Sequence, residues 1–325
     1  MRLVQTLVVR DEADIVDAQI RYHLSAGVDF VIATDHESVD GTTEILGSHE
    51  REGHLHLIRV AGEMREQRWR TRMARLAATE HGADWVINTD ADEFWMPRGG
   101  TLKEVLASVP EPYGVVWALS RHFVPRPDDG AFFAERMTVR VSAQAPINDP
   151  RSPFRPHAKA AHRADPDVRI GFGAHLVRTK RWAALRHWHP ADVLHFPFRS
   201  IEQWERKGTR RARGDKPLGQ YVDALLASES GRAADRYRAL VVSDESLERG
   251  LDAGSLVLDL RLRDALREHG VGTGAGGPPA AFAASPDSGV VQDGAAAREA
   301  DLVRLHRHLD GLQARLTALE DGTGR

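Results

Sequence analysis

The sequence predicts an α/β protein in which helices cover both faces of a mostly parallel sheet, with a helical appendage at the C-terminal end. Two observations support this prediction. Over the first third of the 325 residues, short apolar runs alternate with amphipathic segments of helical periodicity, which is typical of a parallel sheet. The fourth apolar run, residues 85–89, is followed by three carboxylates within four residues, Asp90, Asp92 and Glu93. α/β proteins place ligand sites at such strand ends.

The elements of the first third follow one another in a regular order. Asp11 lies where it can cap the first helix, which has apolar residues up to Leu24 and ends at Gly27. The third helix repeats apolar residues such as Trp69 and Met73 at helical spacing. We expect strands at residues 3–9, 29–34, 55–60 and 85–89, and helices between residues 11 and 27, beginning at residues 42–46, and at residues 64–80.

The pattern is less regular after the acidic segment. Pro110 closes a short predicted helix, and a region rich in Pro, Arg and His follows two further apolar runs. We expect a helix at residues 101–108, strands at residues 114–119 and 136–141, long loops over the sheet edge at residues 142–172, and helices at residues 201–213 and 218–226.

Composition limits the classes of function. A chain of 325 residues with 42% hydrophobic content can form one large domain with an appendage, or two domains. The net charge of -3 gives no reason to expect nucleic acid as a partner, and the absence of Cys excludes thiolate metal sites and Cys nucleophiles. The first apolar run is too short for a signal peptide, and no run is long enough to span a membrane. We therefore expect a cytoplasmic protein.

The last quarter of the chain changes composition. Residues 270–297 are rich in Gly, Ala, Pro and Ser, which is typical of a flexible linker. The next segment, residues 298–320, repeats Leu at steps of three and four, which predicts a helix with a heptad seam. This helix either docks on its own domain or joins a second chain in a coiled coil, so the protein is a possible homo-oligomer.

The acidic segment is the strongest functional feature. Asp90, Asp92 and Glu93 repel one another unless a cation compensates their charge. A hard divalent cation, Mn²⁺ or Mg²⁺, prefers carboxylate oxygens and often shares its ligand shell with substrate phosphates. An Asp-x-Asp pair alone is weak evidence, because acidic loops are common.

Polar residues also follow the other predicted strands. Arg10, Asp11 and Glu12 follow the first strand, residues 35–42 follow the second, and Gln67, Arg68 and Arg72 lie beyond the third. The carboxyl ends of parallel strands lie along one crevice. Carboxylates can accept hydrogen bonds from a base and a ribose, while a metal ion and Arg side chains neutralise a pyrophosphate. The crevice therefore suits a nucleoside diphosphate.

Three segments in this order, residues 9–14, 35–42 and 83–94, resemble the glycosyltransferase family 2-like group with the GT-A fold, which is Rossmann-like. The resemblance covers roughly residues 1–215. It implies a nucleotide-diphosphate sugar donor, by default a UDP-sugar with GDP and dTDP open, and transfer of a hexosyl-type sugar to an acceptor that the sequence does not name. We expect a domain at residues 1–230, with a nucleotide-binding half at 1–98 and an acceptor half at 99–230, and a helical extension at 231–269.

The resemblance also implies roles for individual residues. Asp92 would bind Mn²⁺ or Mg²⁺ and act in catalysis, Asp90 would contact the ribose or the sugar, and Glu93 would only support the loop. Asp11 stands where an Asn is more usual, and Asp40 is either a nucleotide contact or a turn residue before Gly41. The expected donor-binding residues are Arg10, Glu12, Asp35, Asp40, Gln67, Arg72, Asp90, Arg199 and Lys207, with Arg68 a further candidate.

The group usually takes its catalytic base from an acidic motif after a glycine-rich turn. Residues 170–177 contain the glycines but no acid, and His175 stands in that place. A His titrates near neutral pH and can accept the acceptor's proton, as an inverting reaction requires. The rivals are Asp149, Asp165 or a retaining mechanism without such a base.

A second His would complete the metal shell. His195 follows an apolar pair late in the predicted domain and fits best, with His187 and His189 as alternatives. The remaining polar residues of the irregular region, which face either donor or acceptor, are His157, Lys159 and His162.

Two other functions stay open at this point. A sugar nucleotidyltransferase requires a Gly-rich loop after the first strand to hold a triphosphate, and residues 10–13 contain no Gly. A non-catalytic protein that binds a nucleotide or carbohydrate would not need the acids, which are present.

Overall fold

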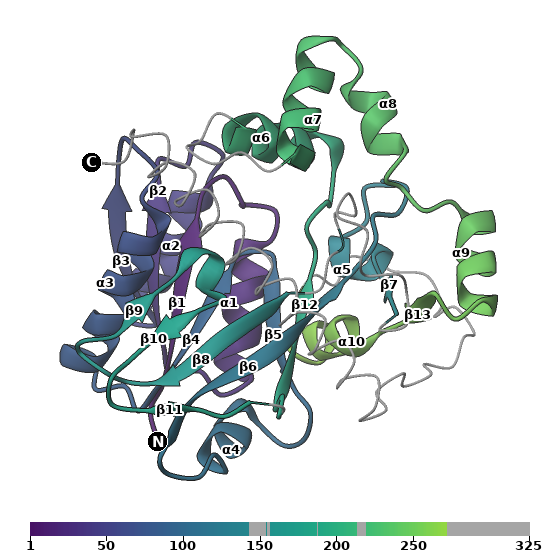
Figure 1. Cartoon of the computed structure of the whole chain (residues 1–325). Helices are drawn as coiled ribbons and strands as arrows, with labels where there is room; N and C mark the ends of the chain where they lie inside the picture. The colour runs from purple at the N-terminus through teal and green to yellow at the C-terminus, as the bar shows by residue number, and fades with distance from the viewer. Residues whose placement is uncertain (143–153, 155–156, 187, 213–218, 272–325) are drawn as a thin grey trace, which may run out of the picture.

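The computed structural model describes residues 1–142, 154, 157–186, 188–212 and 219–271 (Figure 1). The strands are β1 (Leu3–Val9), β2 (Phe30–His36), β3 (Leu55–Val60), β4 (Trp85–Asp90), β5 (Glu93–Pro97), β6 (Tyr113–His122), β7 (Val139–Val141), β8 (Ala158–Arg163), β9 (Arg169–Ile170), β10 (Val177–Arg178), β11 (Ala183–Ala184), β12 (Ala191–His195) and β13 (Leu256–Leu258). The helices are α1 (Val16–Ser25), α2 (Thr42–Arg51), α3 (Glu66–Thr79), α4 (Leu102–Ala107), α5 (Phe133–Arg136), α6 (Ile201–Ala212), α7 (Gly219–Glu229), α8 (Ala233–Arg238), α9 (Asp244–Asp252) and α10 (Arg261–Glu268), with a 3₁₀ turn, η1, at Phe172–Ala174.

The main sheet confirms the predicted α/β class. Its strand order is β3-β2-β1-β4-β8-β6-β12-β5, with β11 beside β6. β3, β2, β1 and β4 run parallel, as do β6 and β12, while β8 is antiparallel to both of its neighbours and β5 is antiparallel to β12. The four N-terminal strands therefore end at one edge of the sheet.

Side chains that alternate along β1 pack against helices on both faces of the main sheet. Leu3 and Leu7 belong to the core cluster that includes buried residues of α1, α2, α4 and α10. Val4 points to the opposite face, where it packs with Met73 and Ala77 of α3. This period of two, with apolar residues at odd and even positions, is what a strand buried on both faces requires.

The prediction of long loops at residues 142–172 was wrong in part, because β8 lies in the middle of the main sheet between β4 and β6 (Figure 1). Its apolar residues are Ala158, Ala160 and Ala161, and Lys159 and His162 between them are also buried. A central strand is recognised in a sequence by an apolar run, and small residues next to a cation do not form one. The sequence pattern therefore did not predict β8.

The strand predicted at residues 136–141 was also too long. Residues 133–136 form the short helix α5, and only Val139–Val141 extend as β7, which pairs with β13. The predicted helices at 201–213 and 218–226 correspond to α6 and α7.

Asp11 does not cap the first helix. α1 begins only at Val16, and Asp11 adopts a left-handed backbone with φ 54°. Its carboxylate accepts a hydrogen bond from the backbone N–H of Val39, 2.9 Å away, which joins the segments after β1 and β2. The expected cap is therefore a contact between two neighbouring strand ends.

The segment expected as a C-terminal helical extension contributes to the main core. Leu262 and Leu266 of α10 are 1% exposed and pack in the cluster that contains α1. The predicted linker at 270–297 and the Leu-rich helix at 298–320 lie outside the described residues, apart from 270 and 271. Within the described part of the chain, no helix is both long and apolar enough to cross a membrane.

Candidate functional site

A crevice of about 1980 Å³ lies at the carboxyl ends of β1 and β4 and along α3. It exceeds the usual volume of a small-ligand pocket, roughly 300–1,000 Å³, so it has room for a donor and an acceptor. Nine of the predicted site residues line it: Arg10, Glu12, Gln67, Arg72, Asp90, Asp92, His175, His195 and Lys207. His157, Lys159 and Arg68 line it as well.

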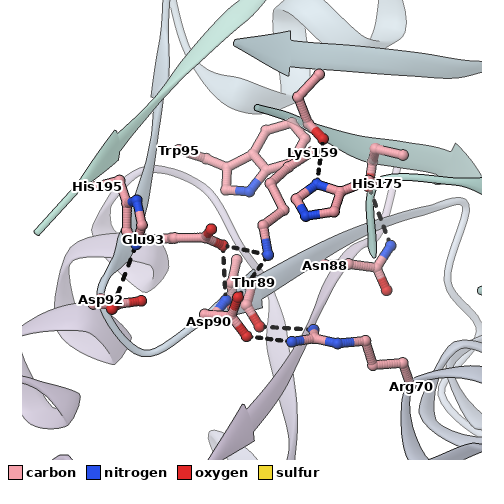
Figure 2. A network of polar contacts seen from close by, with 12 residues as sticks. Arg70, Asn88, Thr89, Asp90, Asp92, Glu93, Trp95, Lys159, His175 and His195 are labelled. Carbon is pink, nitrogen blue, oxygen red and sulfur yellow. Dashed lines mark hydrogen bonds and ion pairs between the residues drawn. The ribbon is translucent and has the colours of Figure 1, made fainter. Parts of the chain in front are cut away.

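Asp90 is held by two cations from different elements (Figure 2). Lys159 of β8 places its Nζ 2.7 Å from Asp90 Oδ2 and 2.9 Å from Glu93 Oε2. Arg70 of α3 pairs with the other oxygen of Asp90 and donates to the carbonyl of Thr89 at 3.0 Å. Glu93 in turn accepts from the backbone N–H of Asp90 at 2.9 Å. The side chain of Asp90 is thereby fixed at the crevice wall.

These contacts decide the charges. Burial alone would raise the pKa of Asp90, but the charges of Arg70 and Lys159 outweigh it and lower the pKa below the usual value of 3.8. Burial would lower the pKa of Lys159, but Asp90 and Glu93 raise it. Burial raises the pKa of Glu93 despite the nearby Lys159. Asp90 is therefore an anion paired with a buried cation at neutral pH.

Asp92 lies in the short turn between β4 and β5 and has different partners. Its carboxylate pairs with Lys207 of α6, and His195 Nε2 is 3.5 Å from Asp92 Oδ2 (Figure 2). The antiparallel register of β5 and β12 sets His195 opposite Glu93, next to the turn. His195 Nδ1 is 2.9 Å from His122 Nδ1, which orients the ring with Nε2 toward Asp92. Burial would raise the pKa of Asp92, but Lys207 and His195 lower it well below 3.8.

The donor atoms at Asp92 and His195 fit a divalent metal only in part. Together they offer one carboxylate and one imidazole nitrogen, and Lys207 already compensates the charge of Asp92. No group of three metal-ligating side chains forms at this crevice within the described residues. Mg²⁺ commonly binds one or two carboxylates together with substrate phosphates and water, so an ion here requires ligands from the donor.

Arg199, which was predicted to bind the donor, is not among the residues that line the crevice, and donor contact by it stays a prediction. Its side chain is 1% exposed, and its guanidinium pairs with Glu12 and donates to Asp14 Oδ2 at 2.6 Å. Burial raises the pKa of Glu12 in spite of the Arg199 charge. Arg199 therefore joins the segment after β12 to the turn after β1, and Glu12 is the member of this cluster that lines the crevice.

Asp35 and Asp40 are also absent from the crevice lining. Asp35 accepts from Ser38 Oγ at 2.6 Å. Asp40 accepts from the N–H of Ala13 at 3.1 Å and of Thr42 at 3.1 Å, so it holds the start of α2. These bonds favour the turn role for Asp40, and donor contact by either residue stays a prediction.

His175 is the predicted base that the crevice contains. Its Nδ1 is 2.9 Å from the carbonyl oxygen of Ala158, which fixes Nδ1 as the donor and leaves Nε2 as an acceptor. Burial lowers the pKa of His175 to about 4. Its rival Asp165 lies outside the lining and accepts from the N–H of Asp167 at 2.9 Å. Asp149 and His187 lie outside the described residues, and His162 and His189 do not line the crevice.

Arg70 and His122 are parts of the site that the sequence pattern did not indicate. Arg70 is fully buried and bonds to Glu66, one turn earlier on α3, at 2.9 Å. An Arg four residues after an acid normally marks an exposed helix face. The sequence feature that could have indicated Arg70 is its position beside Trp69, on the apolar side of the predicted helix. A cation buried there needs a partner of opposite charge.

Among the comparisons with known proteins, the match to a family profile is the finding that bears on function. Residues 4–127 match the family profile described as Glycosyltransferase family 92, and this match supports a transferase. No match was found among curated proteins. Among solved structures, S. aureus TarS 1-349 in complex with UDP-GlcNAc is 14% identical, with a TM-score of 0.39 over 83% of this chain and 93% of that chain. Glucosyl-3-phosphoglycerate synthase from Mycobacterium tuberculosis in complex with Mg²⁺ and UDP is 17% identical, with a TM-score of 0.28 over 37% of this chain and 43% of that chain. Similarity this low carries no argument about the site.

Proposed function

We propose that this chain is a metal-dependent glycosyltransferase that moves a sugar from a nucleotide-diphosphate sugar, by default a UDP-sugar, to an acceptor hydroxyl with inversion. The observation that supports it best is the convergence of Asp90, Asp92, His195 and Lys207 at the strand ends of one large crevice. The family match over residues 4–127 agrees with this chemistry.

The crevice provides separate groups for the two ends of the donor. Asp90, kept ionised by Arg70 and Lys159, can accept hydrogen bonds from ribose or sugar hydroxyls. Lys207 and Arg72 line the same crevice and can neutralise a diphosphate. Transfer builds negative charge on the leaving diphosphate, and cations fixed near it stabilise the transition state more than the ground state.

Asp92 and His195 are the residues that would hold Mn²⁺ or Mg²⁺. Such an ion supplies further positive charge for the leaving diphosphate. Lys207, which pairs with Asp92, can move toward the diphosphate when Asp92 takes another partner. His122 keeps the Nε2 of His195 directed at Asp92.

His175 would accept the proton of the acceptor hydroxyl. With Nδ1 bonded to the Ala158 carbonyl, the lone pair on Nε2 is available, and a pKa of about 4 keeps the ring neutral at pH 7.

We expect His175→Gln to lower the transfer rate by about two to four orders of magnitude while donor affinity stays unchanged. In the wild type, protonation of His175 should not affect the transfer rate between pH 7 and about pH 5. The rate should fall only as the pH approaches about 4, where the ring becomes protonated. A loss below tenfold in the variant would remove His175 from the mechanism.

The function is tested by a thermal-shift panel of nucleotides, nucleotide sugars and nucleoside triphosphates, each with and without Mn²⁺. A ligand of the folded state raises the melting temperature according to its affinity. We expect a nucleoside diphosphate and its sugar ester to stabilise the chain, and to do so more strongly with Mn²⁺. A response to a triphosphate alone would favour a nucleotidyltransferase, and donor binding without transfer or donor hydrolysis would favour a binding protein.

A further inference from the structure

A second cluster of metal-ligating side chains lies where α2 ends and β3 begins. Figure 1 shows the two elements. His49 is in the last turn of α2, Glu52 follows the helix, and His54 precedes β3. Because the crevice lies at the carboxyl ends of the parallel strands, this cluster, at the amino end of β3, is at the opposite edge of the sheet. We propose that His49, Glu52 and His54 form a zinc-binding site separate from the proposed catalytic centre.

The three ligand atoms are already close to the spacing that zinc requires. His49, Glu52 and His54 each offer one ligand atom, and these three atoms all lie within 4.8 Å of one another. Glu52 Oε2 is 3.9 Å from His49 Nδ1 and 3.6 Å from His54 Nδ1. Ligands of a tetrahedral zinc ion at about 2.0–2.1 Å are roughly 3.3–3.4 Å apart, so small side-chain rotations complete the shell.

The backbone holds His54 against His49. The N–H of His54 donates to the carbonyl of His49 at 3.0 Å, and the N–H of Gly53 donates to the carbonyl of Glu50 at 3.0 Å. Gly53 takes φ +81°, a left-handed conformation that favours glycine, and so reverses the chain after the helix. The turn thus sets two imidazoles five residues apart on one side of the helix end.

The buried His49 is oriented as a metal ligand. Its side chain is 3% exposed, and its Nε2 is 2.9 Å from Asp17 Oδ1 of α1. Because an Asp carboxylate accepts hydrogen bonds, this contact assigns the proton to Nε2. His49 Nδ1, directed at Glu52, has no hydrogen-bond partner in the described part of the chain. A carboxylate that orients a ligating His through its other nitrogen is the usual second layer of zinc sites.

The donor set selects the ion. Two imidazole nitrogens and one carboxylate oxygen suit Zn²⁺, whereas Mg²⁺ prefers oxygen ligands. Glu52 and His54 are about half exposed, so an ion can enter and water can take the fourth position. A bound ion would connect α2 and the start of β3, and through Asp17 also α1, so its expected effect is on stability.

The experiment is a Zn²⁺ titration of the tag-free full chain, first stripped with a chelator, followed by melting temperature and by metal content per chain. We expect one Zn²⁺ per chain and a rise of about 5 °C at saturating metal, with no such rise in Mg²⁺. His54→Gln and Glu52→Gln change exposed side chains, so both variants should fold and lose the rise.

Two control variants locate the ion. His81→Gln alters a different His pair, in which His56 Nδ1 is 3.1 Å from His81 Nε2, and Asp92→Asn alters the crevice. Both controls should keep the Zn²⁺-induced rise. The proposal is overturned if the wild type shows no rise, if His54→Gln and Glu52→Gln both keep it, or if a control variant loses it.

Discussion

Asp92→Asn should lower the rate of sugar transfer by about three orders of magnitude or more while the protein stays folded. Asp92 is 2% exposed and lies between Lys207 and His195 in the turn after β4. Asn keeps the shape of the side chain but not its charge. It therefore removes the carboxylate that would bind the divalent ion, so the leaving diphosphate loses the positive charge of that ion.

The experiment measures transfer, or donor hydrolysis, with the donor that the thermal-shift panel identifies. The matched control is Asp167→Asn, which neutralises an exposed Asp outside the crevice lining and should leave the rate unchanged. The melting temperature of each variant shows whether the fold is intact. Full activity in Asp92→Asn would refute the proposed role of this residue.

A chelator distinguishes the contribution of the metal ion from that of the Asp92 carboxylate. The wild type should lose transfer in EDTA and recover it with Mn²⁺, and the Mn²⁺-dependent part of nucleotide stabilisation should be absent from Asp92→Asn. If the wild type keeps its activity in EDTA, the metal mechanism is wrong, and Lys207 with the crevice arginines must stabilise the diphosphate alone.

The sequence predicted the parts of the site that depend on local pattern. Trp85, Val86 and Ile87 form an apolar run, so the strand and the position of Asp90 and Asp92 at its end followed directly. His195 was predicted from an apolar pair before it, and the register of β12 against β5 places it beside Asp92. The strand and the residues at its end are set by local sequence, whereas the position of His195 beside Asp92 depends on the pairing of two distant strands.

The remaining parts depend on contacts between distant segments. The acids were expected to need a metal for charge compensation, but Lys159, 69 residues after Asp90, already pairs with it. Lys159 could not be placed because β8 has no apolar run, and its neighbour in the sheet cannot be inferred from spacing. The pairing of Arg199 with Glu12 could not be predicted either, because the two residues are 187 positions apart.

That pairing makes Arg199→Met the substitution with the largest expected effect on stability. Arg199 is fully buried, and its removal leaves the buried Glu12 and its neighbour Asp14 without their ion-pair partner. Breaking a buried ion pair from one side costs about 3–5 kcal/mol, and we expect a loss of that order in the free energy of unfolding, measured by denaturant titration.

Arg206→Met is the matched control, because Arg206 is 45% exposed and lies 3.8 Å from Asp40. It should change the free energy of unfolding by less than about 0.5 kcal/mol. The double variant Glu12→Gln with Arg199→Met no longer buries a charge, so it should be more stable than Arg199→Met by at least about 1 kcal/mol. It also keeps the test measurable if the single variant does not fold.

The pH dependence of Arg199→Met identifies Glu12 as the source of the loss. The pKa of Glu12 is already raised above 4.5 in the folded wild type, and without Arg199 it rises further. A carboxyl whose folded pKa is raised stabilises the fold below its unfolded pKa, and that contribution is lost as the pH increases through the folded pKa. The deficit of the variant should therefore be largest at neutral pH and decrease as the pH falls toward 4.5. If Arg199→Met loses the same free energy of unfolding at neutral pH and at pH 4.5, or loses none, then the charge of Glu12 does not depend on Arg199.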